Sequence, residues 1–243
     1  MEKLYSEAIA LRAPYCDIHG EWRPGAILET MQETAGEHCE RLNLGRPVMD
    51  GLGVAWVLTR TRVELKQVPR MGEIITAQTW PLPPKHLFFP RVNAFLDSNG
   101  APIGEASSLW VLMDLRTRRI VNNATVLERL PDNADMPAGL PLGAFRPLEG
   151  TPETAELIPP YSDFDLNGHV NNTKYLDWAC NALGHSALAE RRVRAFSVSY
   201  DAEVLPGPTL RTELVCSDDQ FSFCGYDGDR RCFCIVGTLE DRR

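Results

Sequence analysis

A short polar segment in the second half of the chain carries side chains suited to acid–base chemistry on a carbonyl group. Asp165, Asn167 and His169 stand at alternate positions, and Glu203 follows later in the chain. A carboxylate can attack a carbonyl carbon or activate a water molecule, an amide can orient either group, and an imidazole can polarise a carbonyl or transfer a proton. The sequence has no evident Ser-His-Asp set and no cluster with metal-ligand spacing, so the carboxylates are the candidate reactive groups.

The spacing of these residues predicts that they share one side of an extended segment. Alternate side chains of an extended chain point the same way, which would align Asp163, Asp165, Asn167 and His169. Phe164 and Leu166 would then be buried on the other side. A helix that begins at Asn171 or Asn172 would direct free N–H groups and its positive dipole end at the site, where they can hold an oxyanion. The alternative is a plain turn whose Asp and Asn side chains bond their own backbone, with Glu203 as a solvated turn residue.

The two halves of the chain repeat one another. Pro14–His19 aligns with Pro160–Asp165 at an offset of 146 residues, and each match leads into apolar residues at the spacing of an amphipathic helix. In the first half these residues are Ile27, Leu28, Met31, Ala35, Cys39 and Leu42, with Gly45 as the expected stop. In the second half they are Tyr175, Leu176, Ala179, Cys180, Ala182 and Leu183, with the end expected at Gly184.

Strand-like segments follow each predicted helix. They cover residues 56–65, 74–80, 88–96 and 107–113 in the first half, and 210–216, 221–226 and 232–239 in the second. Residues 63–72 are also repeated as residues 198–207, at an offset of 135. We therefore predict an α+β fold in which each of two antiparallel sheets wraps one central helix and the two sheets lie side by side. The predicted domains are residues 1–130 and 148–243, joined by a linker rich in Pro and Gly at residues 131–147.

A comparison of the two copies predicts where the chemistry lies. At the offset of 146 residues, the three residues Asp165, Asn167 and His169 align with His19, Glu21 and Arg23. At the offset of 135 residues, Glu203 aligns with Val68. The acid, amide and imidazole groups are thus expected in the second half alone.

Charge and composition exclude several classes of function. The net charge is -8 and the pI is about 5.2, which opposes binding to nucleic acid or to an anionic membrane. The amino-terminal residues resemble neither a signal nor a transit peptide, so a cytoplasmic location is expected, with reduced cysteines. Cys232 and Cys234 form the closest pair and are expected to be buried thiols, and no metal or other cofactor is predicted.

The string DLNGHVNNTKYLDW, from Asp165 to Trp178, resembles the signature of the acyl-[acyl carrier protein] thioesterases of plastids and bacteria. Three segments of the first half are similar to the amino-terminal repeat of this family: Gln32–His38, Trp56–Arg60 and Thr79–Trp80. The resemblance covers nearly the whole chain and implies two tandem hot-dog folds. It also implies that the catalytic residues are Asp165, Asn167, His169 and Glu203. Plant members often have a Cys directly after that Glu, but this chain has Val204, so a thiolate mechanism at this position is excluded.

The resemblance further implies hydrolysis of fatty acyl-[acyl carrier protein] thioesters without a cofactor. Asp165 would act as nucleophile or as base, and the sequence leaves both routes open. Asn171 and Asn172, at the start of the helix, are the expected oxyanion donors. The acyl chain is expected in the first half, against Met31, Trp56 and Phe89.

Acyl carrier protein is the expected partner. It is acidic, so it requires local positive charge, which residues 116–119 or 191–194 could supply. A homodimer is allowed, whereas nucleic acid and membrane insertion are not expected. The alternatives are an acyl-CoA thioesterase, a hot-dog hydratase that uses an Asp/His pair, and a module that binds acyl thioesters without catalysis. Chain length and saturation of the acyl group stay open.

Overall fold

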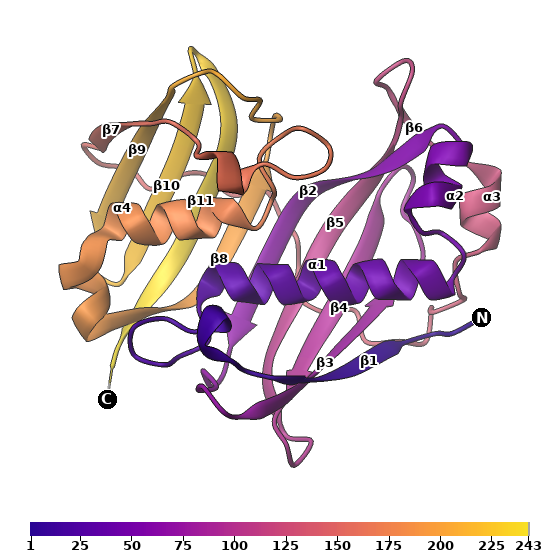
Figure 1. Cartoon of the computed structure of the whole chain (residues 1–243), viewed down its shortest axis with the longest axis horizontal. Coiled ribbons are helices and arrows are strands. Elements are labelled where there is room, and N and C mark those ends of the chain that lie inside the picture. The colour runs from indigo at the N-terminus through magenta and orange to yellow at the C-terminus, as the bar shows by residue number, and fades with distance from the viewer. Residues whose placement is uncertain (243) are drawn as a thin grey trace. The chain divides into compact units, whose positions relative to one another are not determined.

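The computed structural model describes residues 1–242 and divides into two compact units. The first unit is Met1–Leu142 and the second begins at Gly143, so the division falls within the segment predicted as a linker. Each unit consists of an antiparallel sheet and one long helix, α1 or α4 (Figure 1). The predicted α+β architecture is therefore confirmed for each unit.

The strands of the first unit run in order from β1 to β2. In sheet order its strands are β1 (Tyr5–Ala10), β3 (Ile74–Pro81), β4 (Phe89–Leu96), β5 (Pro102–Asp114) and β2 (Val54–Leu65). The two-residue strand β6 (Ile120–Val121) pairs with β5. The four strands predicted from the sequence are β2 to β5, whereas β1 carries only one fully buried side chain and was not predicted. A short η1 turn (Ala13–Tyr15) follows β1.

Helix α1 (Pro24–Arg41) packs against β3 and β1. Pro24 suits the first position of a helix, because its missing N–H would have no partner there. The helix does not end at Gly45 as predicted. Asn43 takes the left-handed conformation, with φ of 55°, and the N–H groups of Asn43 and Leu44 donate to Glu40 O and Cys39 O at 2.9 and 2.8 Å. These bonds form a Schellman motif, in which an Asn can replace the usual Gly.

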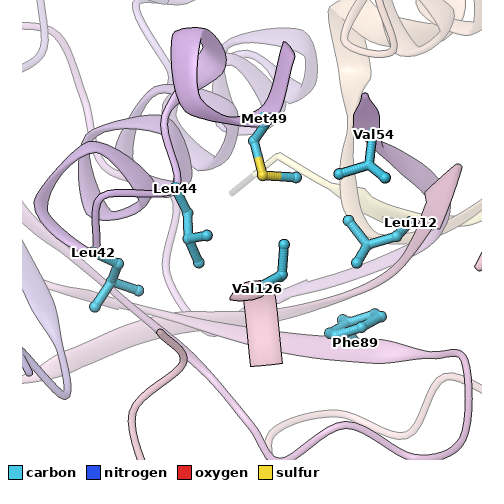
Figure 2. Packing of buried hydrophobic residues seen from close by; sticks show 7 residues of the cluster. All are labelled: Leu42, Leu44, Met49, Val54, Phe89, Leu112 and Val126. Atoms are coloured by element: carbon cyan, nitrogen blue, oxygen red, sulfur yellow. The ribbon is translucent and has the colours of Figure 1, made fainter. Parts of the chain in front are cut away.

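Two short helices close one end of the first unit. They are α2 (Arg46–Gly51) and α3 (Ala124–Glu128), and Asn123 caps α3 by accepting the N–H of Val126 at 3.2 Å. Apolar side chains from both helices and from the adjoining strands point toward one another in Figure 2. This buried cluster consists of Leu42, Leu44, Met49, Val54, Phe89, Leu112 and Val126.

The second unit repeats the arrangement with a smaller sheet. In sheet order its strands are β8 (Arg191–Tyr200), β11 (Arg230–Asp241), β10 (Gln220–Asp227), β9 (Leu210–Ser217) and β7 (Glu153–Leu157). The strands predicted over residues 210–239 are β9 to β11, while β7 is almost entirely exposed and was not predicted. A short η2 turn (Tyr161–Asp163) precedes the central helix.

Helix α4 (Lys174–Glu190) is two helical segments joined at Gly184. Gly184 has φ of 81° and ψ of 164°, so the first segment ends there as predicted, but a second helical segment that was not predicted continues to Glu190. The helix begins at Lys174 after Thr173, not at Asn171 or Asn172 as predicted. Tyr175, Leu176 and Ala179 are buried as expected, and Trp178 joins them, whereas Ala182 is exposed close to the break.

The segment predicted as a linker is partly packed onto the first unit. Asn133 is fully buried, and its side-chain amide donates to Lys3 O and Pro81 O, both at 2.8 Å. A side chain at Gly139 would collide with Ser107 and Val92. Residues 131–142 therefore cover one face of the first sheet.

The cysteines of the described residues are free thiols. Cys232 and Cys234 are both buried, as predicted. Among residues 1–242, none of the helices combines the length and the apolar character needed to cross a lipid bilayer.

Candidate functional site

The polar segment of the second unit is a tight turn. Phe164 pairs with Val170 across an isolated bridge, and Asp165 N donates to His169 O at 3.0 Å. Gly168 N donates to Asp165 O at 3.0 Å, with φ of 79° at Gly168, where glycine is favoured. The prediction of an extended segment with alternating side chains is therefore wrong. Leu166 is 88% exposed at the tip of the turn rather than buried.

Folding back brings the three polar side chains together. Asp165 Oδ1 accepts the N–H of Asn167 at 2.8 Å, and Oδ2 accepts its side-chain amide at 3.3 Å. His169 Nδ1 lies 3.8 Å from Asp165 Oδ1, too far for a hydrogen bond, and 3.5 Å from Val170 O. Asp165 Oδ1 and Val170 O are both hydrogen-bond acceptors, so they favour the tautomer with its proton on Nδ1. The Nε2 atom of this tautomer can accept a hydrogen bond or a proton from a substrate. The side chains of Asp165 and His169 are each about one-quarter exposed, so both remain accessible.

Backbone contacts bring Glu203 to the same turn. Val170 N donates to Val204 O at 2.9 Å, so the residue after His169 is bonded to the residue after Glu203. The N–H groups of Asp201 and Ala202 donate to Cys232 O at 2.8 and 3.0 Å, which anchors the Glu203 segment on β11. Burial raises the pKa of Tyr175, and the charges of Cys232, Asp165 and Glu203 raise it further. The negative charges of Asp165 and Glu203 thus both favour the neutral form of the buried Tyr175 hydroxyl at the start of α4.

The two candidate oxyanion donors before α4 differ in how their backbone groups are bonded. Asn171 is engaged on both sides, because its N–H donates to Asp163 O at 2.8 Å and its Oδ1 accepts the N–H of Thr173 at 3.0 Å. Asn172 has its carbonyl bonded by the hydroxyl of Tyr200 at 3.2 Å. Within residues 1–242 the side-chain N–H groups of both residues have no hydrogen-bond partner, and Asn172 also keeps its backbone N–H available.

Asp163, Tyr175 and Trp178 position this turn, and the prediction that Asp163 shares the side of the reactive groups is wrong. Asp163 does not face the reactive groups, because its Oδ2 accepts the indole N–H of Trp178 at 2.7 Å. Trp178 packs with Tyr175, with ring centroids 5.1 Å apart. The signal was the Tyr-x-x-Trp spacing on the predicted helix, which places both rings on the side that Asp163 meets.

The first unit contains the same turn with different side chains. Asp17 N donates to Glu21 O at 2.8 Å, Gly20 N donates to Asp17 O at 3.0 Å, and Asp17 Oδ1 accepts the N–H of His19 at 2.9 Å. These bonds align Asp17 with Asp165, an offset of 148 residues rather than the predicted 146. Asn167 and His169 therefore correspond to His19 and Glu21, so the predicted correspondence with Glu21 and Arg23 is wrong. An acid stands in both turns, but the complete set of acid, amide and imidazole is found at the second turn alone. The first turn has no amide side chain, and its imidazole, His19, stands at the position of Asn167 rather than that of His169.

The second offset, of 135 residues, is confirmed. In the first unit Trp22 N donates to Pro69 O at 3.0 Å, which is the counterpart of the bond from Val170 to Val204. Glu203 thus corresponds to Val68. The buried carboxylate of Glu21 bonds to Arg70 at 3.3 Å, so it is neutralised by an ion pair.

The residues predicted to hold an acyl chain all lie inside the first unit. Met31 is buried on α1. Trp56 and Phe89 pack edge to face, with ring centroids 5.0 Å apart. Phe89 belongs to the cluster of Figure 2, and Trp56 packs against it. Among the described residues, no group of three or more His, Cys, Asp or Glu side chains is placed to hold a metal ion.

Comparison with known families covers both units. The model of the acyl-ACP thioesterase N-terminal domain matches residues 2–127, and that of the C-terminal domain matches residues 149–227. The chain belongs to the acyl-ACP thioesterase family. The predicted resemblance is confirmed, and the turn of the second unit lies in the part that matches the C-terminal domain of acyl-ACP thioesterases.

Similar proteins come from bacteria and plants. A chloroplastic palmitoyl-acyl carrier protein thioesterase of Gossypium hirsutum is 27% identical over 222 residues, which is 85% of this chain and 53% of that protein. The chain thus spans about half the length of the curated relatives it matches.

The solved structures of acyl-ACP thioesterases show the fold. An acyl-ACP thioesterase from Bacteroides thetaiotaomicron has a TM-score of 0.83 at 24% identity, with 98% of each chain covered. The 12:0-ACP thioesterase from Umbellularia californica has a TM-score of 0.88 at 21% identity, covering 100% of this chain and 99% of that one. The predicted double hot-dog fold is therefore confirmed.

Proposed function

We propose that this protein hydrolyses fatty acyl-[acyl carrier protein] thioesters at the turn of the second unit. The observation that supports the proposal is the backbone bond from Val170 N to Val204 O, which joins the segment of Asp165, Asn167 and His169 to the segment of Glu203. The first unit has the same turn but replaces three of these four residues. If the second turn served the fold alone, the residues of the first turn would suffice there, and these three replacements would not be needed.

The reaction breaks the C–S bond of the thioester and adds water. In one route an oxygen of Asp165 attacks the carbonyl carbon, the carrier thiolate leaves, and water then hydrolyses the mixed anhydride. In the other route a carboxylate takes a proton from water, and the resulting hydroxide attacks. Asn167 orients Asp165 through their hydrogen bond of 3.3 Å. His169 and Glu203 supply the proton that the thiolate needs, and Asn172 stabilises the oxyanion.

The proposed carrier partner is acidic, and one of the two predicted basic clusters is better suited to bind it. Arg191 pairs with Asp241, and Arg192 and Arg194 both pair with Glu240, so the cluster at residues 191–194 is largely neutralised. The cluster at residues 116–119 is exposed throughout. Leu115 and Ile120 flank it and are 42% and 51% exposed. We infer that acyl carrier protein docks at residues 115–120.

The first test replaces the two carboxylates separately and together. Asp165→Asn and Glu203→Gln should each lower turnover about 100- to 10,000-fold, as expected for positioned acid–base groups, and the double variant should lose little more. The matched control is Asp17→Asn, because an Asn oxygen can still accept the backbone N–H groups of the turn in either unit. It should stay within about twofold of the wild type. The measurement is thiol release from acyl-[acyl carrier protein], with folding checked by thermal unfolding.

Three results would count against the proposal. Near-normal turnover in folded Glu203→Gln would reduce this residue to a turn carboxylate. Near-normal turnover in Asp165→Asn as well would leave an acyl-binding module as the better interpretation. A change in double-bond absorbance without thiol release would identify a hydratase.

A further inference from the structure

The interior of the first unit contains a stripe of polar side chains between the sheet and α1. Register places them on one face, because residues directly opposite one another in antiparallel strands share a face. Arg91 lies opposite Ser108, which lies opposite Thr61, and Asn93 lies opposite Thr79. Arg91 contacts His38 of α1, so this is the face that the helix covers.

Arg91 is a buried cation at one end of this stripe. It is 7% exposed and donates to His38 Nδ1 and Thr79 Oγ1, both at 3.2 Å, and to Cys39 Sγ at 3.8 Å. Because Arg91 has only donors, His38 Nδ1 must be unprotonated, and its Nε2 donates to Glu2 O at 3.1 Å. Among residues 1–242 no carboxylate pairs with Arg91. Its positive field therefore favours any oxygen acceptor brought nearby.

Asn93 and Thr61 lack hydrogen-bond partners in this interior. Asn93 is 1% exposed, and neither its amide nitrogen nor its amide oxygen has a partner. Thr61 is also 1% exposed, and its hydroxyl is unpaired. Buried polar groups are nearly always paired in folded proteins, so such atoms need a reason. Arg91 precedes Asn93 by two residues on β4, so the two side chains point to the same face of the sheet.

The chemistry of these atoms selects one kind of ligand group. The amide of Asn93 offers a donor and an acceptor, which a hydroxyl group can satisfy together. An oxo group only accepts, so it would leave the amide oxygen unpaired, and a plain hydrocarbon chain would satisfy neither. Phe89 lies two residues from Arg91 on the same side of β4 and packs with Trp56, so apolar contacts for a chain lie beside the polar stripe.

We propose that the first unit recognises a fatty-acyl chain that carries a hydroxyl group, with Asn93 as the residue that reads the hydroxyl. The amide nitrogen of Asn93 donates a hydrogen bond to the hydroxyl oxygen, and its amide oxygen accepts one from the hydroxyl, beside the charge of Arg91. This inference rests on the proposed acyl-thioester function and names its substrate class.

The test uses a panel of acyl-[acyl carrier protein] substrates of one chain length, either unsubstituted or hydroxylated at successive carbons. At one hydroxyl position the kcat/KM of the wild type should exceed that of the unsubstituted substrate at least about tenfold. Asn93→Leu, which is similar in size and apolar, should abolish this preference. Its Tm should not fall, because no hydrogen bond within the protein is lost. Thr61→Val is a second variant that keeps the shape of the side chain, and it should weaken the preference.

Ser107→Ala is the matched control. The Ser107 hydroxyl is also buried and unpaired, but it lies opposite Val92 on the other face of the same sheet, beneath Gly139. The hydroxyl preference should survive this change. If Ser107→Ala removes it as completely as Asn93→Leu does, the assignment to the helix-covered face is wrong.

The remaining outcomes separate this inference from the proposed function. Equal hydrolysis of unsubstituted and hydroxylated substrates would overturn the inference and leave the thioesterase proposal intact. If no thioester is hydrolysed at all, thermal shifts with free hydroxylated and unsubstituted fatty acids decide. A larger shift with the hydroxylated acid that Asn93→Leu loses would support recognition, whereas equal shifts would overturn it.

Discussion

Asp17 and Asp165 show how one side chain can serve two purposes. Both carboxylates accept the backbone N–H two residues later, at 2.9 and 2.8 Å, so both organise a turn. The second also accepts a side-chain amide and lies close to an imidazole and to the segment that carries Glu203. The turn alone explains an Asp at this position, and the neighbours of Asp165 are what distinguish it as a candidate reactive group.

His38 gives the first unit a stability that depends on pH. Burial, and then the charge of Arg91, lower its pKa from 6.5 to about 4. The unfolded chain therefore takes up a proton at a higher pH than the folded protein. Above pH 6.5 the side chain is neutral in both states. As pH falls from 6.5 toward 4, the free energy of unfolding should fall by up to about 1.4 kcal/mol per pH unit.

The measurement is urea unfolding at intervals between pH 7.5 and 4.5. His38→Asn keeps an acceptor for Arg91 but cannot titrate, so its free energy of unfolding should depend less on pH in this window. His185→Asn removes an exposed histidine and should keep the slope of the wild type. The same slope in His38→Asn and the wild type would show that other groups cause the loss.

Two glycines in the central helices should respond oppositely to the same substitution. Gly184 has φ of 81° and ψ of 164°, a conformation that is essentially restricted to glycine. Gly36 lies within α1, and an added Cβ would meet nothing within 4 Å at either position. Gly184→Ala should therefore lower the free energy of unfolding by about 1–3 kcal/mol. Gly36→Ala should raise it by about 0.5–1 kcal/mol, since glycine is a poor helix former.

Chemical unfolding of the two variants beside the wild type tests both signs. Because neither Cβ meets a neighbour, crowding cannot explain a loss at Gly184. If Gly184→Ala were as stable as the wild type, the joint between the two segments of α4 would have to be a regular helix.

The helices and most strands could be predicted from the sequence because apolar spacing reports burial directly. The edge strands β1 and β7 escaped because their side chains are mostly exposed. The first helix stop was missed because Asn43, rather than Gly45, takes the left-handed conformation. Sequence identity between Pro14–Tyr15 and Pro160–Tyr161 suggested an offset two residues too short, since the turn is set by its Asp and not by the Pro.

At the candidate site, the predicted local geometry was wrong, while the predicted residues remain candidates. The motif made Asp165 and Glu203 candidates, and one backbone bond, from Val170 N to Val204 O, links their segments. The predicted extended conformation failed because Gly168 allows the chain to reverse within a few residues. The contact between Asp163 and Trp178 could not be deduced, because it requires the angle at which the turn enters α4.

The charge of the whole molecule opposes the partner that we propose for it. A net charge of -8 repels an acidic carrier protein at long range, so productive encounters depend on a local positive surface. The exposed turn at residues 115–120 offers three arginines between two exposed aliphatic side chains. This combination suits an acidic surface with apolar residues among its charges.

Reversing charge on this turn should weaken binding of the carrier protein without affecting the chemistry. We expect Arg116→Glu/Arg119→Glu to raise KM for acyl-[acyl carrier protein] about tenfold, with kcat nearly unchanged, because such charges act on the encounter. Hydrolysis of an acyl-pantetheine thioester, which lacks the carrier protein, should not change. Added salt should lower kcat/KM of the wild type toward that of the variant, because screening weakens exposed charges.

The control for net charge is Arg12→Glu/Lys85→Glu, which makes the same total change at two other exposed positions of the first unit. If docking is local, this control should keep KM within about twofold of the wild type, since a distant exposed charge is largely screened. An equal rise of KM in both double variants would show that net charge alone governs the encounter. An unchanged KM in Arg116→Glu/Arg119→Glu would place the carrier protein elsewhere, and the partly neutralised arginines of β8 would then be the next surface to test.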